Sequence, residues 1–313
     1  MTLEPAATVF LAPGQRRGVR VPWWAKIVLK LVLARLPVPH AWWRRIGVFR
    51  HGCLADDVER RGADVQGHLA RYRALCAAPL RRVVEIGPGD SVASALWTKA
   101  EGADETWLID AGRFAVDDPA HYRAATQCIA RHGLEPPVLA APGGIASVLS
   151  ATGAVYRTDG LGALTALADL SVDFVFSQAV LEHIPLAQFE RFLGESFRVL
   201  RPGGVASHMI DLEDHLGGAL NHLRFSRRFW EWSAIAESGF YTNRLRASEI
   251  CRSAADAGFI VSVAQLVRWS SLPTPRSALN HEFQAFSDEE LAIAGLWLVL
   301  QKPQPAMEAS AAP

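Results

Sequence analysis

Short apolar runs alternate with amphipathic stretches through most of this chain, from about residue 80 to residue 302. The apolar runs predict strands at residues 83–86, 106–110, 154–160, 172–178, 205–210, 259–267 and 296–301. The stretches between them predict helices, among them residues 118–133, 188–200 and 248–257. Strands that alternate with helices are typical of βαβ units, so the pattern favours an α/β fold with a parallel sheet.

The first strand runs into a glycine turn, Gly87-Pro88-Gly89-Asp90-Ser91. Glycine suits a backbone that turns sharply or that lets a ligand approach closely. Asp110 ends the next strand about 20 residues later, where a carboxylate can accept hydrogen bonds from ribose hydroxyls. Dinucleotides and S-adenosylmethionine are the two cofactor classes that use this arrangement.

Charges around the turn favour the second cofactor class. A dinucleotide site needs a third glycine for close helix packing, and Val92 stands in that position. Glu85 and Asp90 flank the turn, and their carboxylates would repel a pyrophosphate but attract the ammonium group of S-adenosylmethionine.

Four sequence blocks then follow in a characteristic order. They are Glu85-Ile86-Gly87-Pro88-Gly89, Asp110, Asp173-Phe174 with Leu181-Glu182-His183, and Leu200-Arg201-Pro202-Gly203-Gly204. On these blocks the chain resembles the class I S-adenosylmethionine-dependent methyltransferases over residues 80–302. The resemblance implies a Rossmann-like, doubly wound sheet of about seven strands, mostly parallel, with an antiparallel last strand.

The resemblance also implies a set of cofactor contacts. They are Glu85, Gly87, Gly89, Asp110, Asp159 and Gln178. Asp159 would accept from the adenine amino group; the alternative is that it caps the helix after Gly160.

Ionisable side chains at two later strand ends are the candidates for chemistry on the methyl acceptor. A sulfonium is already activated, so the protein must hold the nucleophile in line and, for a hydroxyl, supply a base. We predict His183 as this base, with His208 and Asp211 as further catalytic candidates and His215 beside them. The alternative for His183 is a hydrogen bond to backbone with no role in catalysis.

A metal ion is not expected at this site. Some O-methyltransferases of this class, including those of small RNAs and of the ubiquinone pathway, bind Mg²⁺ through a Glu-x-x-Glu-His motif. The corresponding run here, Ala179-Val180-Leu181-Glu182-His183, lacks the first glutamate. A weaker alternative keeps Glu182 and His183 as ligands, with His208 or Asp211 replacing the missing one.

An insertion at residues 211–247 separates the fifth and sixth predicted elements of the sheet and is rich in aromatic residues and arginines. Such insertions lie over the carboxyl ends of the strands, so we predict that it forms the acceptor pocket. Packing in a core is the alternative for its aromatic residues. A cluster of its arginines would favour an acceptor that carries phosphate or carboxylate.

The chain has no net charge, but its N-terminal part is basic. No acidic residue lies between Glu4 and Asp56, and the basic ones are Arg16, Arg17, Arg20, Lys26, Lys30, Arg35, Arg44, Arg45 and Arg50. A helix at residues 23–36 would be ~21 Å long, too short for a ~30 Å hydrocarbon core. Its tryptophans and lysines suit a peripheral membrane contact, and a lid over the cofactor is the alternative.

We therefore expect a basic helical extension at residues 1–79, a catalytic domain at 80–302 and a disordered tail at 303–313. Basic residues outside the catalytic fold argue against nucleic acid as partner. Four widely spaced cysteines fit a cytoplasmic protein, which the membrane contact would place on the inner face of the membrane. The predicted function is O-methylation of a small molecule or of a glycan or lipid intermediate. An NAD-linked oxidoreductase and a non-catalytic S-adenosylmethionine-binding protein are the alternatives.

Overall fold

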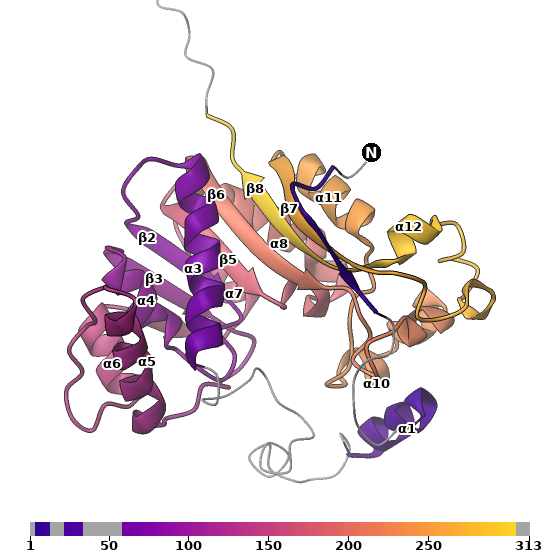
Figure 1. Ribbon diagram of the computed structural model, residues 1–313, viewed down its shortest axis with the longest axis horizontal. Helices are drawn as coiled ribbons and strands as arrows, with labels where there is room; N and C mark the ends of the chain where they lie inside the picture. The colour runs from indigo at the N-terminus through magenta and orange to yellow at the C-terminus, as the bar shows by residue number, and fades with distance from the viewer. Residues whose placement is uncertain (1–3, 13–21, 34–57, 305–313) are drawn as a thin grey trace, which may run out of the picture.

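The computed structural model describes residues 4–12, 22–33 and 58–304 (Figure 1). Most of the basic run and residues 305–313 of the predicted tail lie outside the described residues. One eight-stranded sheet, in the order β1-β7-β8-β6-β5-β2-β3-β4, forms the centre of the fold. Its strands are β1 (Thr8–Leu11), β2 (Arg82–Ile86), β3 (Glu105–Ile109), β4 (Val155–Arg157), β5 (Val172–Gln178), β6 (Leu200–Asp211), β7 (Ile260–Trp269) and β8 (Ile293–Gln301).

The sheet is parallel except at β8, which runs antiparallel to both β6 and β7. This confirms the predicted doubly wound α/β fold and its antiparallel last strand. It has one strand more than predicted because β1 pairs with β7, with Thr8 opposite Leu266. The division at residue 80 remains a prediction, and β1 and the helix α3 (Val58–Leu75), which both precede it, pack on the sheet.

Helices cover both faces of the sheet. One face carries α3, α4 (Ser94–Ala100), α5 (Pro119–Arg131) and α6 (Ile145–Thr152), whose apolar side chains form one core. The other carries α7 (Leu161–Thr165), α8 (Leu186–Val199) and α11 (Ala247–Asp256). Neighbouring strand residues serve opposite cores, as Val83 and Val84 do, because side chains alternate across a strand.

Most of the helix ends predicted from local sequence signals lie within two residues of the observed ends. Asp118 caps α5 as predicted, since its side chain accepts from the Ala120 N–H at 2.9 Å and Pro119 follows it. The observed strand ends differ more from the predicted ones. The strand β6 begins at Leu200 rather than at residue 205, and its register with β5 shifts near Val172.

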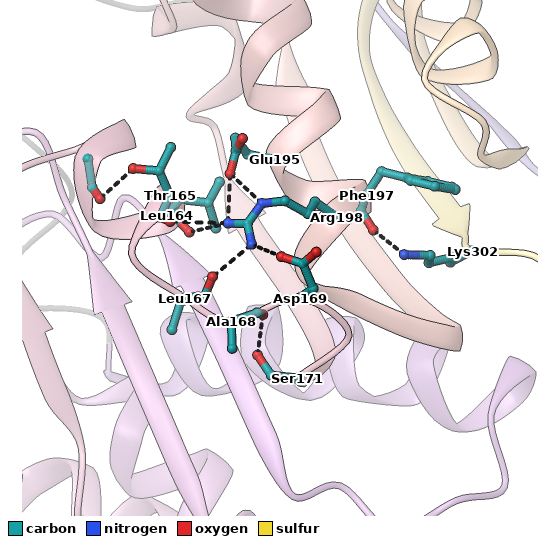
Figure 2. A network of polar contacts seen from close by, with 11 residues as sticks. Leu164, Thr165, Leu167, Ala168, Asp169, Ser171, Glu195, Phe197, Arg198 and Lys302 are labelled. Atoms are coloured by element: carbon teal, nitrogen blue, oxygen red, sulfur yellow. Dashed lines mark hydrogen bonds and ion pairs between the residues drawn. The ribbon is translucent and has the colours of Figure 1, made fainter.

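Arg198 of α8 fixes the loop between α7 and β5 (Figure 2). Its guanidinium donates to the Leu167 carbonyl at 2.8 Å and forms ion pairs with Asp169 and Glu195. Nearby, the Lys302 ammonium donates to the Phe197 carbonyl at 2.7 Å. These contacts lie where β5 begins, so the opposite ends of the strands remain for ligands.

The insertion after β6 contains short elements and a small core of its own. These elements are the 3₁₀ helix η2 (Asn221–Arg224) and the helices α9 (Arg227–Trp230) and α10 (Ser233–Ala236). The helix α1 (Trp23–Leu33) lies beside α10 in Figure 1 and packs on this core through Trp23, Ile27 and Leu31. Trp24 and Val28 are 58% and 57% exposed. The apolar side chains of this helix therefore form a packed stripe and an exposed stripe.

The remaining elements are the short helices η1 (Leu181–His183), η3 (Arg276–Ala278) and α12 (Asp288–Leu291). Among the described residues, no helix is both long enough and apolar enough to cross a membrane.

Candidate active site

The glycine turn follows β2 at the carboxyl edge of the sheet. Gly87 and Gly89 have φ angles of +69° and +67°, a region that favours glycine. The Gly87 N–H donates to the Ile109 carbonyl at 2.8 Å, and the Gly89 N–H donates to the Asp110 carboxylate at 2.8 Å. The turn and the end of β3 are thus joined, and Asp110 lies beside both glycines as predicted.

The segment after β5 closes on this turn. Ala179 has a φ of +53°, so the chain bends sharply after Gln178 and brings Val180 against Gly87. A Cβ on Gly87 would lie 2.5 Å from Val180 Cγ2. Val180 can therefore pack this closely on the backbone of Gly87 only because this residue has no side chain.

Glu85 points into the interior rather than toward the edge. It is 2% exposed, accepts a hydrogen bond from the Ser94 hydroxyl and forms an ion pair with Arg61 at 3.2 Å. Burial raises the pKa of the Glu85 carboxyl, and the Arg61 charge opposes that shift. A cofactor contact for Glu85 remains a prediction, and it would require the carboxylate to exchange these partners.

Arg61 is a residue of this site that the sequence analysis missed. It lies on α3, and its guanidinium also donates to the Pro88 carbonyl within the glycine turn at 2.7 Å. A lone arginine in an amphipathic helix has no local signal that connects it to a turn some 27 residues away. Arg61 stabilises the turn through this carbonyl, while Asp110 binds the Gly89 N–H.

Two further predicted cofactor residues lie along the same edge. The Asp159 carboxylate is exposed and forms an ion pair with Arg157 at 2.9 Å. It does not cap α7, because Gly160 precedes that helix and no side chain caps it. The Gln178 side chain shares a hydrogen bond with His68 Nε2 at 3.1 Å. Their roles in cofactor binding remain predictions.

His183 and His215 form a pair at the acceptor side. The Nδ1–H of His183 donates to the Tyr241 carbonyl at 2.9 Å, so the neutral ring carries its lone pair on Nε2. That Nε2 lies 3.1 Å from Nε2 of His215, and the two rings stack with centroids 4.8 Å apart. The backbone hydrogen bond that we considered as an alternative is present, and it orients the other nitrogen toward the pair.

Glu182 lies beneath this pair and is 2% exposed. Burial and the nearby Asp211 carboxylate raise the pKa of Glu182 well above its usual range. Neither carboxylate oxygen accepts a hydrogen bond of good geometry from the described residues, and the backbone N–H groups of Glu182 and Asp211 only partly oppose the rise of its pKa. Both acids line a cavity of about 10 Å³, room for about one water molecule, together with His222 and Thr242.

His208 does not reach this cluster. It is fully buried beneath α8, where its ring meets Phe192 and its Nδ1 shares a hydrogen bond with Ser177 at 2.8 Å. Burial lowers the pKa of His208 to about 3. In the alternative metal set that we considered, His215 takes the place given to His208: ligand atoms of Glu182, His183 and His215 all lie within 4.8 Å of one another.

The two most buried arginines of the insertion hold backbone instead of an anion. Arg244 donates to the Phe225 carbonyl at 2.7 Å, and Arg246 donates to the Ile293 carbonyl at 2.6 Å. Arg246 also reaches the carbonyls of Leu212 and Leu291. These two side chains therefore give no support to a phosphate or carboxylate group on the acceptor.

Comparison with known proteins finds one family model, described as a methyltransferase domain, that matches residues 149–207. These residues run from the end of α6 through β5 and into β6. No curated protein matches the sequence of this chain.

This chain is also similar to solved structures whose sequence identity to it is low. Phosphoethanolamine N-methyltransferase 2 of Haemonchus contortus, in complex with S-adenosyl-L-methionine, is 15% identical with a TM-score of 0.43. The match covers 77% of this chain and 53% of that one, so this chain corresponds to about half of that protein. An S-adenosylmethionine-dependent methyltransferase of Mesorhizobium loti is 16% identical over 76% of this chain and 100% of that one, with a TM-score of 0.41. A putative sarcosine dimethylglycine methyltransferase of Galdieria sulphuraria is 13% identical over 84% and 97%, with a TM-score of 0.43.

Proposed function

We propose that this chain is a class I S-adenosylmethionine-dependent methyltransferase that methylates a hydroxyl oxygen of a small molecule or of a glycan or lipid intermediate. The observation that carries this proposal is the His183–His215 pair, with its 3.1 Å contact between Nε2 atoms, on the same strand edge as the glycine turn. A hydroxyl needs a proton acceptor to become a good nucleophile, whereas an unprotonated amine does not. A histidine whose Nδ1–H is fixed by a carbonyl offers such an acceptor at Nε2.

The residues present fit S-adenosylmethionine at the carboxyl edge of β2 and β3. The cofactor supplies a methyl group on a sulfonium, which is ready for displacement. Gly87 and Gly89 present partly buried backbone without side chains, and a Cβ at Gly87 would clash with Val180. Asp110 holds the turn with one oxygen, and carboxylate oxygens have further lone pairs for ribose hydroxyls.

In this proposal the methyl acceptor binds next to the insertion. His183 is exposed at the end of η1 and contacts the insertion, which supplies His215 and the Tyr241 carbonyl. The insertion's own core is aromatic, with Trp230, Phe240 and Tyr241 buried in it. Because Arg244 and Arg246 bind backbone, an uncharged hydroxyl acceptor is favoured over an anionic one.

We also propose that the enzyme is cytoplasmic and contacts the inner face of the membrane peripherally. Trp24, Val28 and Leu29 give α1 an exposed apolar stripe on the side away from the insertion. The surrounding sequence is basic and free of acids up to Asp56, which suits anionic lipid headgroups. This contact would bring a lipid intermediate to the insertion, on which α1 packs.

Three measurements test the proposed function. Equilibrium binding of radiolabelled S-adenosylmethionine against NAD tests the cofactor, and Asp110→Ala should weaken binding of the former by ~1 to 3 kcal/mol. Methyl transfer to a panel of hydroxyl acceptors tests the reaction. His183→Ala should lower turnover roughly 10²-fold and leave cofactor affinity unchanged, whereas the exposed His281→Ala should change neither. Preferential NAD binding, or cofactor binding without transfer to any acceptor, would favour one of the two alternative functions.

A further inference from the structure

We infer that Glu182, His183 and His215 bind a first-row transition-metal ion such as Zn²⁺ or Mn²⁺ between the sheet and the insertion. The site joins η1, at the edge of the sheet, to the first residues after β6. Binding of the ion stands on the geometry alone, while its use in the reaction rests on the proposed function.

The spacing of the ligand atoms fits one ion. In a tetrahedral site with metal–nitrogen bonds of ~2.0–2.1 Å, two ligand atoms lie about 3.3 Å apart. The Nε2 atoms of His183 and His215 are 3.1 Å apart, and the Glu182 ligand atom lies within 4.8 Å of both. A tilt of the His215 ring out of its stack would direct both lone pairs at one ion.

The hydrogen bond at His183 prepares that residue as a ligand. Histidines that bind metals usually donate their second ring N–H to a carboxylate or a backbone carbonyl, which fixes the tautomer and the direction of the lone pair. The Nδ1–H of His183 donates in this way to the Tyr241 carbonyl at 2.9 Å. Its Nε2 is therefore the nitrogen with the lone pair.

Glu182 provides an independent indication of a cation. A buried carboxyl group without hydrogen-bond partners is costly, and it is more costly beside a second acid. Glu182 is 2% exposed and Asp211 lies nearby. The backbone N–H groups of Glu182 and Asp211 lower the pKa of the Glu182 carboxyl, but neither oxygen accepts a hydrogen bond of good geometry from the described residues. A bound cation would satisfy these oxygens and balance the charge of both acids.

The ligand types indicate the class of ion. Two imidazoles and one carboxylate suit Zn²⁺, Mn²⁺ and neighbouring ions, whereas Mg²⁺ prefers oxygen ligands and retains several waters. Three protein ligands leave a fourth position open, as in catalytic zinc sites. An acceptor hydroxyl in that position would lose its proton more readily, and His183 would act as the base only without the ion.

A second group of possible ligands in the described chain is different in character. Glu59, Cys128 and His132 also lie close together, but Glu59 forms an ion pair with Arg131 at the surface. Cys128 donates to the same carboxylate at 3.1 Å. This group has no unbalanced buried acid, so it serves as the control site.

The test is a titration with Co²⁺ and Zn²⁺. It uses the full-length protein, which is purified without a polyhistidine tag and treated with chelator beforehand. We expect one equivalent of Co²⁺ to give visible d–d absorption bands, and Zn²⁺ to displace it and to raise the melting temperature. Glu182→Gln and His215→Ala should each weaken binding at least 10-fold, whereas His132→Ala should leave it unchanged. Glu182→Gln preserves the shape of the side chain, so its loss of binding would not reflect unfolding.

Two results would overturn the site: a wild-type protein that binds neither ion, or binding that His132→Ala abolishes and Glu182→Gln does not. Failure of the site and failure of the proposed function are separable. Stoichiometric Co²⁺ binding that depends on Glu182 supports the site even if no hydroxyl acceptor is methylated. Methyl transfer that is unaffected by chelation would retain the function and remove the ion from the reaction.

Discussion

Gly87 joins two segments that are far apart in sequence, because only a residue without a side chain fits between the end of β2 and Val180. This contact places the cofactor side of the site directly beside the chain that leads to Glu182 and His183. A change at this one residue should therefore affect both stability and ligand binding.

A matched pair of alanine substitutions separates steric conflict from backbone strain. Gly87→Ala and Gly102→Ala both place a side chain at positive φ, +69° and +95°, which costs about 1–2 kcal/mol. Only Gly87→Ala adds a clash, 2.5 Å from Val180 Cγ2, for about 1–3 kcal/mol more, because nothing lies within 4 Å at Gly102. Urea unfolding should show the larger loss for Gly87→Ala, and S-adenosylmethionine affinity should fall in this variant alone. Equal losses in both variants would contradict the role of the Val180 contact.

The sequence predicted those site residues whose signals are local. Gly87, Gly89 and Asp110 lie in a turn and at a strand end, so spacing along the chain was sufficient to place them together. His215 reaches His183 only through the fold of the insertion, for which no short-range pattern exists. The prediction for His208 was wrong because side chains alternate along a strand: His208 shares a face of β6 with Ile210, which lies in the core under α8.

At the scale of elements, α3 controls the glycine turn through its close packing. Gly62 faces Trp97 of α4 so tightly that any Cβ would clash with the indole, and the preceding residue, Arg61, reaches the Pro88 carbonyl. The helix can bring its arginine to the turn only at this short separation. Sequence periodicity predicts that such a helix exists but not its distance from a neighbour.

Two glycines of α3 test this packing. Gly62→Ala should destabilise the protein by about 1–3 kcal/mol, because the Trp97 indole has to move. Gly67→Ala meets only the flexible end of Arg71 at 3.2 Å, and should be neutral or should stabilise the helix by up to about 1 kcal/mol. Thermal unfolding of both variants measures the difference. A Gly62→Ala protein as stable as wild type would show that α3 is free to shift.

We expect the exposed stripe of α1 to bind membranes, whereas its packed stripe only attaches the helix to the insertion. Full-length protein should sediment with phosphatidylserine-containing vesicles at low salt and be released at high salt, since each basic residue near the surface adds ~1 kcal/mol. Trp24→Ser with Val28→Ser should reduce this binding, whereas Ile260→Ser on β7, 53% exposed, should not. Wild-type protein that stays in the supernatant at low salt would leave α1 as a cap on the insertion only.

At the scale of the whole molecule, buried neutral histidines make the fold sensitive to acid. Burial lowers the pKa values of His68 and His208 to about 3, from an ordinary value of 6.5. Below pH 6.5 the histidines bind protons in the unfolded chain but not in the folded protein. The free energy of unfolding therefore falls as the pH drops from 6.5 toward 3. At pH 5 each histidine should lower the free energy of unfolding by about 2 kcal/mol, because each pH unit below 6.5 contributes about 1.36 kcal/mol.

Urea unfolding at pH 7.5 and pH 5 checks this sensitivity. His208→Gln should show a smaller difference in unfolding free energy between the two pH values than wild type, by about 2 kcal/mol, whatever its stability at pH 7.5. His281→Gln, at an exposed position, should keep the wild-type difference. The same pH difference in all three proteins would contradict the buried-histidine account.

The last strand of the described residues, β8, lies inside the sheet, between β6 and β7. While the chain emerges from the ribosome, β6 keeps an open edge, and β1 and β7 can pair only with each other. The sheet closes when residues 293–301 have been made and pair with both neighbours. A chain that terminates before Ile293 would therefore lose the middle of its sheet, and its two halves would have no strand to connect them.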